Sequence, residues 1–281
     1  MPDAIADTDF VPQSLHDAFA ANDFSRFRAI LSDLTAAGKA AAWAAFGLDA
    51  AEQKKPEILA SLLPHRPNAV SSPRQPPDLL LACVSDSNSP EVCDVVVDAG
   101  IDINIPPSYG PDLLLACVEE NKVRLVNHLL SPPIAAKTGA RINSMLYADM
   151  YPFLVAARSP EMVQTLLAHG DKLQGSMALH MAALRGNLSM MECLLDAGAN
   201  VNENLRADQD RPENRWLKLH REDLGAPLHY AVDGRSSLSA AKLLIARGAD
   251  TTMRDYKGRT VLERAESSSK GKWPELEELL G

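Results

Sequence analysis

The octet PDLLLACV occupies residues 77–84 and occurs again at residues 111–118, 34 positions later. A catalytic group is normally needed once, so an identical apolar octet at two places does not mark an active site. A stack of similar units does need the same apolar segment in each unit, because no unit buries its faces alone. The octet therefore predicts a protein built from repeats.

Two longer segments extend this pattern: GSMALHMAALRGNLSMMECLLDAGANVN (Gly175–Asn202) and GAPLHYAVDGRSSLSAAKLLIARGADTTMRD (Gly225–Asp255). Both contain Leu-His-x-Ala, then a glycine (Gly186 or Gly234), then a Gly-Ala pair. Each unit is expected to be a short apolar helix, a break of small residues and a second apolar helix. Small alanines recur at intervals of 34, 40, 26, 49 and 34 along the chain, at Ala82, Ala116, Ala156, Ala182, Ala231 and Ala265. The interval of 49 is one period plus an insertion.

These residues resemble the ankyrin repeat, whose unit of about 33 residues is a turn followed by two antiparallel helices. The resemblance is strong over Gly175–Gly281, weaker over Pro76–Lys172 and slight before Pro76. The Thr-Pro-Leu-His signature of the family is never complete in this chain, and leucines (Leu80 and Leu114) take the histidine position in two units. We expect those units to rely on apolar packing.

The resemblance implies an all-α solenoid of stacked helix-turn-helix units, with short turns or hairpins between them. We predict a repeat domain of about six units over residues 76–281, with an insertion at residues 203–224. Residues 1–75 are predicted to be a helical cap or degenerate repeats, followed by a proline-rich linker. Four glycines are expected to end second helices in the left-handed conformation, namely Gly100, Gly170, Gly198 and Gly248.

Composition and charge narrow the classes of partner and compartment. The net charge of −9 argues against nucleic acid as a partner. No run of 18 apolar residues exists, which argues against a membrane span. The acidic N-terminus does not resemble a secretory signal, and four cysteines are too few for a disulfide framework. We therefore predict a cytoplasmic or nuclear protein that is not secreted.

The sequence contains no catalytic or phosphate-binding motif, no metal-ligand spacing and no sign of a cofactor. His180 and His229 occupy the structural position of the family. The four cysteines are interpreted as small core residues: Cys83, Cys93, Cys117 and Cys193. Asn104 and Asn202 lie in turns after second helices, where asparagine tolerates unusual backbone and bonds locally. The resemblance also implies that such asparagines are of the kind that a modifying enzyme of the family hydroxylates.

The predicted function is that of a non-catalytic scaffold that binds a protein partner. By resemblance, the partner-binding groove includes residues near the ends of first helices, which are Val84, Ser85, Val118, Glu119, Arg158, Ser159, Leu184, Arg185 and Asp233. Among these, the predicted partner-binding residues are Arg158, Arg185 and Asp233, and an acidic partner would suit the two arginines. Tyr109, Tyr147 and Tyr151 lie in neighbouring loops.

The insertion at 203–224 is the second predicted binding element. It holds Trp216 among many charged groups, and Trp and Arg are enriched at binding hot spots. Its candidate contact residues are Arg206, Arg211, Arg215, Trp216, Lys218, His220 and Arg221. The alternative for this segment is a solvated hairpin whose Trp packs on its own repeat.

A different class of function also fits the sequence. The groove and the 203–224 loop would then enclose a small molecule or substrate, with His220, Arg215 or Tyr230 giving acid–base or hydrogen-bonding help. A deep closed pocket with converging polar groups would favour this enzyme or ligand-binding alternative, and an open groove would favour the scaffold.

Overall fold

The computed structural model describes residues 11–66, 77–84, 89–104, 112–142, 153–204, 224–233, 238–267 and 273–280, without the side chains of residues 77, 78 and 81. Across these residues the regular structure is helical, with no strand, as the all-α prediction requires. None of the helices in these segments is long and apolar enough to cross a membrane. The chain divides into two compact units, Met1–Ala140 and Arg141–Gly281.

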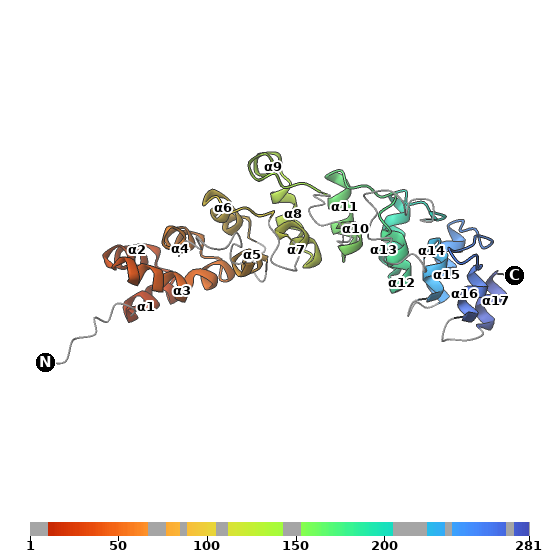
Figure 1. Ribbon diagram of the computed structural model, residues 1–281, viewed down its shortest axis with the longest axis horizontal. Helices are drawn as coiled ribbons and strands as arrows, with labels where there is room; N and C mark the ends of the chain where they lie inside the picture. The colour runs from red at the N-terminus through yellow and green to blue at the C-terminus, as the bar shows by residue number, and fades with distance from the viewer. Residues whose placement is uncertain are drawn as a thin grey trace. The chain divides into compact units, whose positions relative to one another are not determined.

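The first unit contains helices in consecutive antiparallel pairs (Figure 1). They are α1 (Gln13–Ala20), α2 (Phe24–Asp33), α3 (Ala36–Glu52), α4 (Pro56–Leu62), the 3₁₀ turn η1 (Leu63–His65), α5 (Pro77–Val84), α6 (Pro90–Asp98), α7 (Leu113–Glu119), α8 (Val123–Leu129) and the additional helix α9 (Pro132–Thr138). First helices contact one another in the order α3, α5, α7, and second helices in the order α2, α4, α6, α8. Two layers of helices therefore run through this unit.

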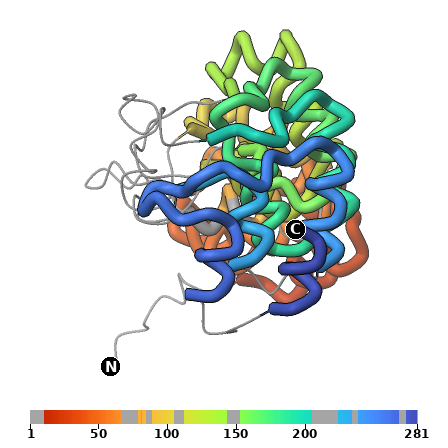
Figure 2. Tube along the Cα trace, turned by 90° about the vertical axis from the view of Figure 1, so that its right-hand side faces the viewer, coloured from red at the N-terminus to blue at the C-terminus, as the bar shows by residue number. Residues whose placement is uncertain are grey.

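The second unit repeats this arrangement. It contains α10 (Phe153–Ala156), α11 (Pro160–Ala168), α12 (Ala178–Arg185), α13 (Leu188–Asp196), α14 (Pro227–Asp233), α15 (Leu238–Ala246), α16 (Val261–Ser267) and α17 (Pro274–Leu280). The even-numbered helices contact in sequence, and so do the odd-numbered ones. Figure 2 shows the pairs of this unit, from green to blue, one behind another.

Left-handed residues end the helices in both layers. The four glycines predicted to follow second helices all have positive φ, between 72° and 95°. The residue after each of them donates its N–H to the carbonyl five positions earlier, as from Ala199 to Leu194 at 2.9 Å. The turn inside a pair has the same geometry, with Asn22, Lys54, Asn121 or Gly186 in the left-handed position. The prediction for the glycines is confirmed, and it follows from their lack of a Cβ.

The core consists of the apolar side chains that face the neighbouring pair. Leu80 and Leu114, in the histidine position, are each 4% exposed. Val84 and Val118 are 2% and 0% exposed, so the expectation that they point into a binding groove is wrong. They pack inward because the first helices of this unit are short and their last turn still lies in the core.

The cysteines and turn asparagines mostly behave as predicted. Cys83, Cys93 and Cys117 are buried, whereas Cys193 is only partly buried, with its Sγ 3.8 Å from the carbonyl oxygen of Pro160. Asn104 and Asn202 do bond locally, through Asp102 and Asn200. Neither asparagine has a positive φ, so the unusual backbone expected there is absent.

The predicted boundary near residue 75 falls inside the first unit. The pairs α1–α2 and α3–α4 precede this boundary. The helix α3 nevertheless packs directly on α5, which follows the boundary. Lys55 joins the first two pairs: its Nζ donates to the carbonyl of Phe19 at 2.6 Å and lies 3.8 Å from the centre of the Phe19 ring. Six helix pairs follow residue 76 in the described segments.

Candidate partner-binding surface

Arg158 and Arg185 approach the same end of α10. Arg158 follows α10 and is exposed. Arg185 is the last residue of α12, is also exposed, and its Nη1 donates to the carbonyl of Val155 at 3.1 Å. A cation is stabilised at the C-terminal end of a helix by the unpaired carbonyl groups there. Arg158 therefore follows α10 in the chain, and Arg185 from the next helix pair contacts a carbonyl at the same end of α10.

Leu188 lies just beyond Arg185, at the start of α13, and is 37% exposed. Asn187 precedes it and caps α13 by accepting the N–H of Met190. The cap fixes the path of the chain between Arg185 and α13. Leu188 is therefore an exposed apolar residue that follows Arg185 by three positions, directly after a capped turn.

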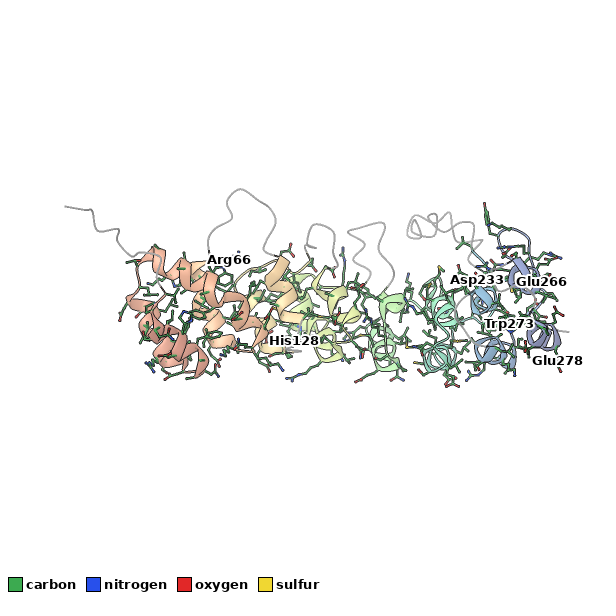
Figure 3. All side chains as sticks on the ribbon, turned by 90° about the horizontal axis from the view of Figure 1, so that it is seen from below. Arg66, His128, Asp233, Glu266, Trp273 and Glu278 are labelled. Carbon is green, nitrogen blue, oxygen red and sulfur yellow. The ribbon has the colours of Figure 1, made fainter. Side chains whose placement is uncertain are left out.

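Asp233, the third predicted contact residue, has a structural partner. It ends α14, and its Oδ2 accepts the Nε of Arg264 from α16 at 2.8 Å and also pairs with Nη2 of that arginine. The Asp233 side chain is 28% exposed and that of Arg264 only 2%. Figure 3 labels Asp233 in the penultimate helix pair. The Asp233 carboxylate is thus engaged in an ion pair between consecutive helix pairs.

The same arginine belongs to a buried polar network. Nη1 of Arg264 lies 3.4 Å from Oδ2 of Asp255, and Nε of Arg259 donates to the same oxygen at 2.9 Å. Asp255 is fully buried, and burial acts to raise the pKa of its carboxyl. Hydrogen bonds from Arg259, with the charges of Arg259 and Arg264, outweigh that effect and lower the pKa below its ordinary value. Asp255 therefore stays ionised within the fold.

The two histidines are structural, as expected. His180 is fully buried, its Nε2 lies 2.9 Å from the carbonyl oxygen of Glu203, and burial lowers its pKa to about 4. His229 accepts the N–H of Ala226 through Nδ1, and its pKa is also lowered, chiefly by burial and then by the charge of Arg264. Both rings are therefore neutral at pH 7 and bond backbone groups.

Tyr230 has little access to a ligand. It is 5% exposed, its ring packs edge-on against His180 at 5.2 Å between centroids, and the Arg264 guanidinium lies 5.4 Å from its ring centre. Among the described residues no group of three or more His, Cys, Asp or Glu side chains is arranged to hold a metal ion.

The insertion is described only at its ends. Glu203 accepts the N–H of Gly175 at 2.7 Å, and Asn204 donates to the carbonyl of Arg254 at 3.3 Å. At the far end, the carbonyl of Leu224 accepts the N–H of Tyr256 at 2.8 Å. The predicted contact residues between positions 206 and 221, Trp216 included, lie outside the described residues, as do Tyr109, Tyr147 and Tyr151.

Sequence reasoning missed the Asp233–Arg264–Asp255–Arg259 network. These residues are up to 31 positions apart and belong to different helix pairs, so no local pattern marks them. A nearby feature was readable: Thr260 and Glu263 form a capping box, in which each side chain accepts the N–H of the other residue. The Thr-x-x-Glu spacing is enough to predict this capping box from the sequence.

Comparisons with known proteins agree with this architecture. A family model described as ankyrin repeats (3 copies) matches residues 113–205 and 152–255, which together span just over half of the chain. The E3 ubiquitin-protein ligase KEG of Arabidopsis thaliana is 33% identical over 116 residues, which are 39% of this chain and 6% of that protein. This chain therefore spans only a small part of that relative's length.

Two solved structures are also similar. The ankyrin repeat domain of Bcl-3, described as a unique member of the IkappaB protein family, has a TM-score of 0.55 at 21% identity, covering 79% of this chain and 93% of that one. The human ASB11 ankyrin repeat domain has a TM-score of 0.41 at 20% identity, covering 84% and 97%. The likeness to Bcl-3 is one of fold.

Proposed function

This chain belongs to the ankyrin repeat family, and we propose that it is a non-catalytic scaffold that binds a protein partner through Arg158, Arg185 and the 203–224 loop. Ankyrin repeats are protein-interaction domains in general. A stack of short, packed helices loses little freedom on binding, so its affinity comes from preorganised side chains.

The position of the ionisable side chains supports a scaffold over an enzyme. Four of the most deeply buried ones, His180, His229, Asp255 and Arg264, each bond to another part of the fold, mostly between consecutive pairs. A general acid or base needs access to a substrate proton. Tyr230, named for the enzyme alternative, is 5% exposed and lies between His180 and Arg264.

The proposed contact surface has its centre at the end of α10. Arg158 and Arg185 supply positive charge there, and Leu188 supplies an exposed apolar side chain. Arg185 is held by the carbonyl of Val155, which lowers the entropy lost when a partner binds. Asp233 contributes less, since Arg264 already neutralises it.

The test is cross-linking of the full-length protein to its partners in a cell extract, followed by measurement of affinity for the partner identified. Arg158→Glu and Arg185→Glu should each weaken binding by about 1–2 kcal/mol, the range of a moderate hot spot. Lys242→Glu is the matched control, because Lys242 is exposed on α15 and the charge change is the same. Equal losses in all three variants, or no loss in either arginine variant, would contradict the proposed surface.

The loop is tested by replacing residues 205–223 with a short Gly-Ser turn that keeps Glu203, Asn204 and Leu224. Both ends stay bonded to neighbouring segments, so helical content should be unchanged by circular dichroism. If the loop binds the partner, this variant should have a lower affinity for the same partner than the wild type. Unfolding of this variant would mean that the loop is part of the packing, with Trp216 in the core.

A further inference from the structure

Ser267, the last residue of α16, carries an exposed hydroxyl group that is bonded on two sides. Its Oγ accepts a hydrogen bond from Nη1 of Arg259 at 3.0 Å, and its O–H donates to the carbonyl of Arg264 at 2.8 Å. Ser267 is exposed and the Arg259 side chain is 26% exposed, so the hydroxyl group is accessible to a modifying enzyme. A cation is thus already aimed at an oxygen atom that can carry a phosphoryl group.

The Arg259 guanidinium is held in place from the other side. Its Nε donates to Oδ2 of Asp255 at 2.9 Å, and its Nη2 lies 2.7 Å from the same oxygen. The third nitrogen, Nη1, is the one that donates to Ser267. A planar guanidinium presents its N–H donors in fixed directions. Arg259 can therefore bond the buried carboxylate and an anion on Ser267 at the same time.

The groups around Ser267 make an added negative charge dependent on Arg259. Ser267 ends its helix, where unpaired carbonyl groups oppose an anion. Glu266 is exposed directly before it (Figure 3), and Glu263, one turn earlier, is engaged by Arg254. A phosphoserine carries a charge of about −1.5 to −2 at pH 7. The Arg259 guanidinium is the group placed to offset this repulsion.

The turn that Arg259 closes also holds the C-terminal end of the insertion. Oδ1 of Asp255 accepts the N–H of Arg259 at 2.9 Å, and the N–H of Asp255 donates to the carbonyl of Arg259 at 2.9 Å. The next residue, Tyr256, donates its N–H to the carbonyl of Leu224 at 2.8 Å. Gly225 lies against the same turn, since a Cβ placed on it would be 3.2 Å from Cβ of Asp255. A bond that fastens Arg259 therefore acts on the place where the insertion ends.

We propose that Ser267 is a phosphorylation site, and that Arg259 binds its phosphate and so fastens the 255–259 turn to the end of α16. In the reaction, Oγ of Ser267 forms a bond to the γ-phosphorus of a nucleoside triphosphate held by a protein kinase. The bond from that phosphorus to the diphosphate oxygen breaks, and the hydroxyl proton passes to a base of the kinase. This inference rests on the proposed scaffold function and adds its regulation, because the turn holds one end of the 203–224 loop.

The modification is tested by incubating the full-length protein with ATP, Mg²⁺ and a panel of purified serine/threonine kinases. Tandem mass spectrometry of the peptides then locates the phosphate. A phosphate on Ser267 is the expected result, and Ser267→Ala should remove that phosphopeptide. No phosphate on Ser267 from any kinase of the panel would overturn the proposal.

The effect of the modification is tested on the full-length protein with phosphoserine inserted at position 267 during translation. The Tyr256 amide should exchange about fivefold more slowly than in the unmodified protein, because the phosphate adds charge-assisted bonds to Arg259. The slowing should be smaller with Arg259→Lys, which keeps the charge without the fork, and absent with Arg259→Gln. Phosphoserine in place of Ser189, which is exposed on α13, is the matched control and should leave Tyr256 unchanged. Thermal melts of each variant check that the fold is kept, and the Lys variant gives the comparison if the Gln variant is unfolded.

Two further results would overturn the inference: unchanged or faster exchange at Tyr256 with phosphoserine at position 267, or the same slowing with phosphoserine at position 189. The proposed scaffold function has a separate readout, the partner found by cross-linking. If Arg158→Glu weakens binding of that partner while the phosphate leaves Tyr256 unchanged, the scaffold proposal stands and the phosphorylation proposal fails. If the phosphate slows exchange while the arginine and loop variants bind the partner normally, the reverse holds.

Discussion

Histidine and leucine are two solutions for one position of the repeat. At His180 the Nε2–H of the ring donates to the backbone carbonyl of Glu203, while Leu80 and Leu114 fill the same position with apolar volume alone. The histidine adds a hydrogen bond to the segment that follows the next helix, and it also adds a buried group that resists protonation. Its pKa of about 4 lies below the ordinary value near 6.5, because burial disfavours the charged form.

This difference predicts a pH dependence of stability. The unfolded chain binds a proton at His180 near pH 6.5, whereas the folded chain does so only near pH 4, so the stability is fully present above pH 6.5 and lost between these values. The loss amounts to about 3 kcal/mol by pH 4. Urea unfolding at pH 7 and pH 5 should show a smaller pH effect in His180→Leu than in the wild type. The slope will not vanish, since the pKa of His229 is lowered as well; identical slopes would contradict the prediction.

At the scale of the helix pair, the turn between the two helices is a shared element with variable residues. Gly186 and Lys54 occupy equivalent positions, with φ of 65° and 57°. The residue after each donates to the carbonyl five positions earlier, from Asn187 to Ala182 and from Lys55 to Ala50. The backbone therefore needs the left-handed conformation at both places, whichever side chain is present.

A reciprocal substitution tests this equivalence. Lys54→Gly should raise the free energy of unfolding by about 0.5–1 kcal/mol, because glycine adopts this conformation without a Cβ clash. Gly186→Lys should lower it by about 1 kcal/mol for the opposite reason. Chemical denaturation measures both. Asn121→Gly, at φ 55°, serves as a third case that should also be stabilised; destabilisation by the glycine variants would show that the side chains matter more than the backbone.

At the scale of the whole molecule, stability is distributed over neighbouring pairs in each compact unit. In the first unit polar side-chain pairs join α6 to α8 and α9: the ion pairs of Glu91 with Arg124 and Asp98 with Lys137, and the hydrogen bond of Asp94 with His128. These pairs are largely exposed and contribute little each. In the second unit the Asp255 network is buried, so loss of one partner there leaves an uncompensated charge.

Two substitutions should therefore act on different units. Leu114→Asp places a carboxylate in an apolar interface and should cost about 3–5 kcal/mol. Asp255→Ala should cost about 3 kcal/mol, because Arg264 and Arg259 lose their shared acceptor. Hydrogen exchange should show the larger loss of protection within residues 11–140 for the first variant and within 141–281 for the second. Uniform loss along the chain in either variant would mean that the protein unfolds as one cooperative body.

The features that recur along the chain can be predicted from the amino-acid sequence alone. The octet at 77–84 and 111–118, the glycines after second helices and the histidine or leucine position repeat because every pair must bury the same face and end its helices in the same way. The arrangement of the candidate surface was open to sequence reasoning only in part. The sequence predicts Arg158 and Arg185 as contact residues, and the position of both at the end of α10 depends on the packing of α10 against α12.

Which polar residues bond inside the fold depends on how the helix pairs stack. The sequence analysis placed Asp233 on the binding surface, and no sequence pattern marked Asp255 or Arg264 as partners. These side chains bond to one another because consecutive helix pairs pack α14 against α16. Val84 and Val118 were predicted to line the groove. They are buried instead, because the packing of each first helix extends to its last turn. Local pattern specifies a repeat, whereas contacts between repeats depend on which side chains the stacking brings together.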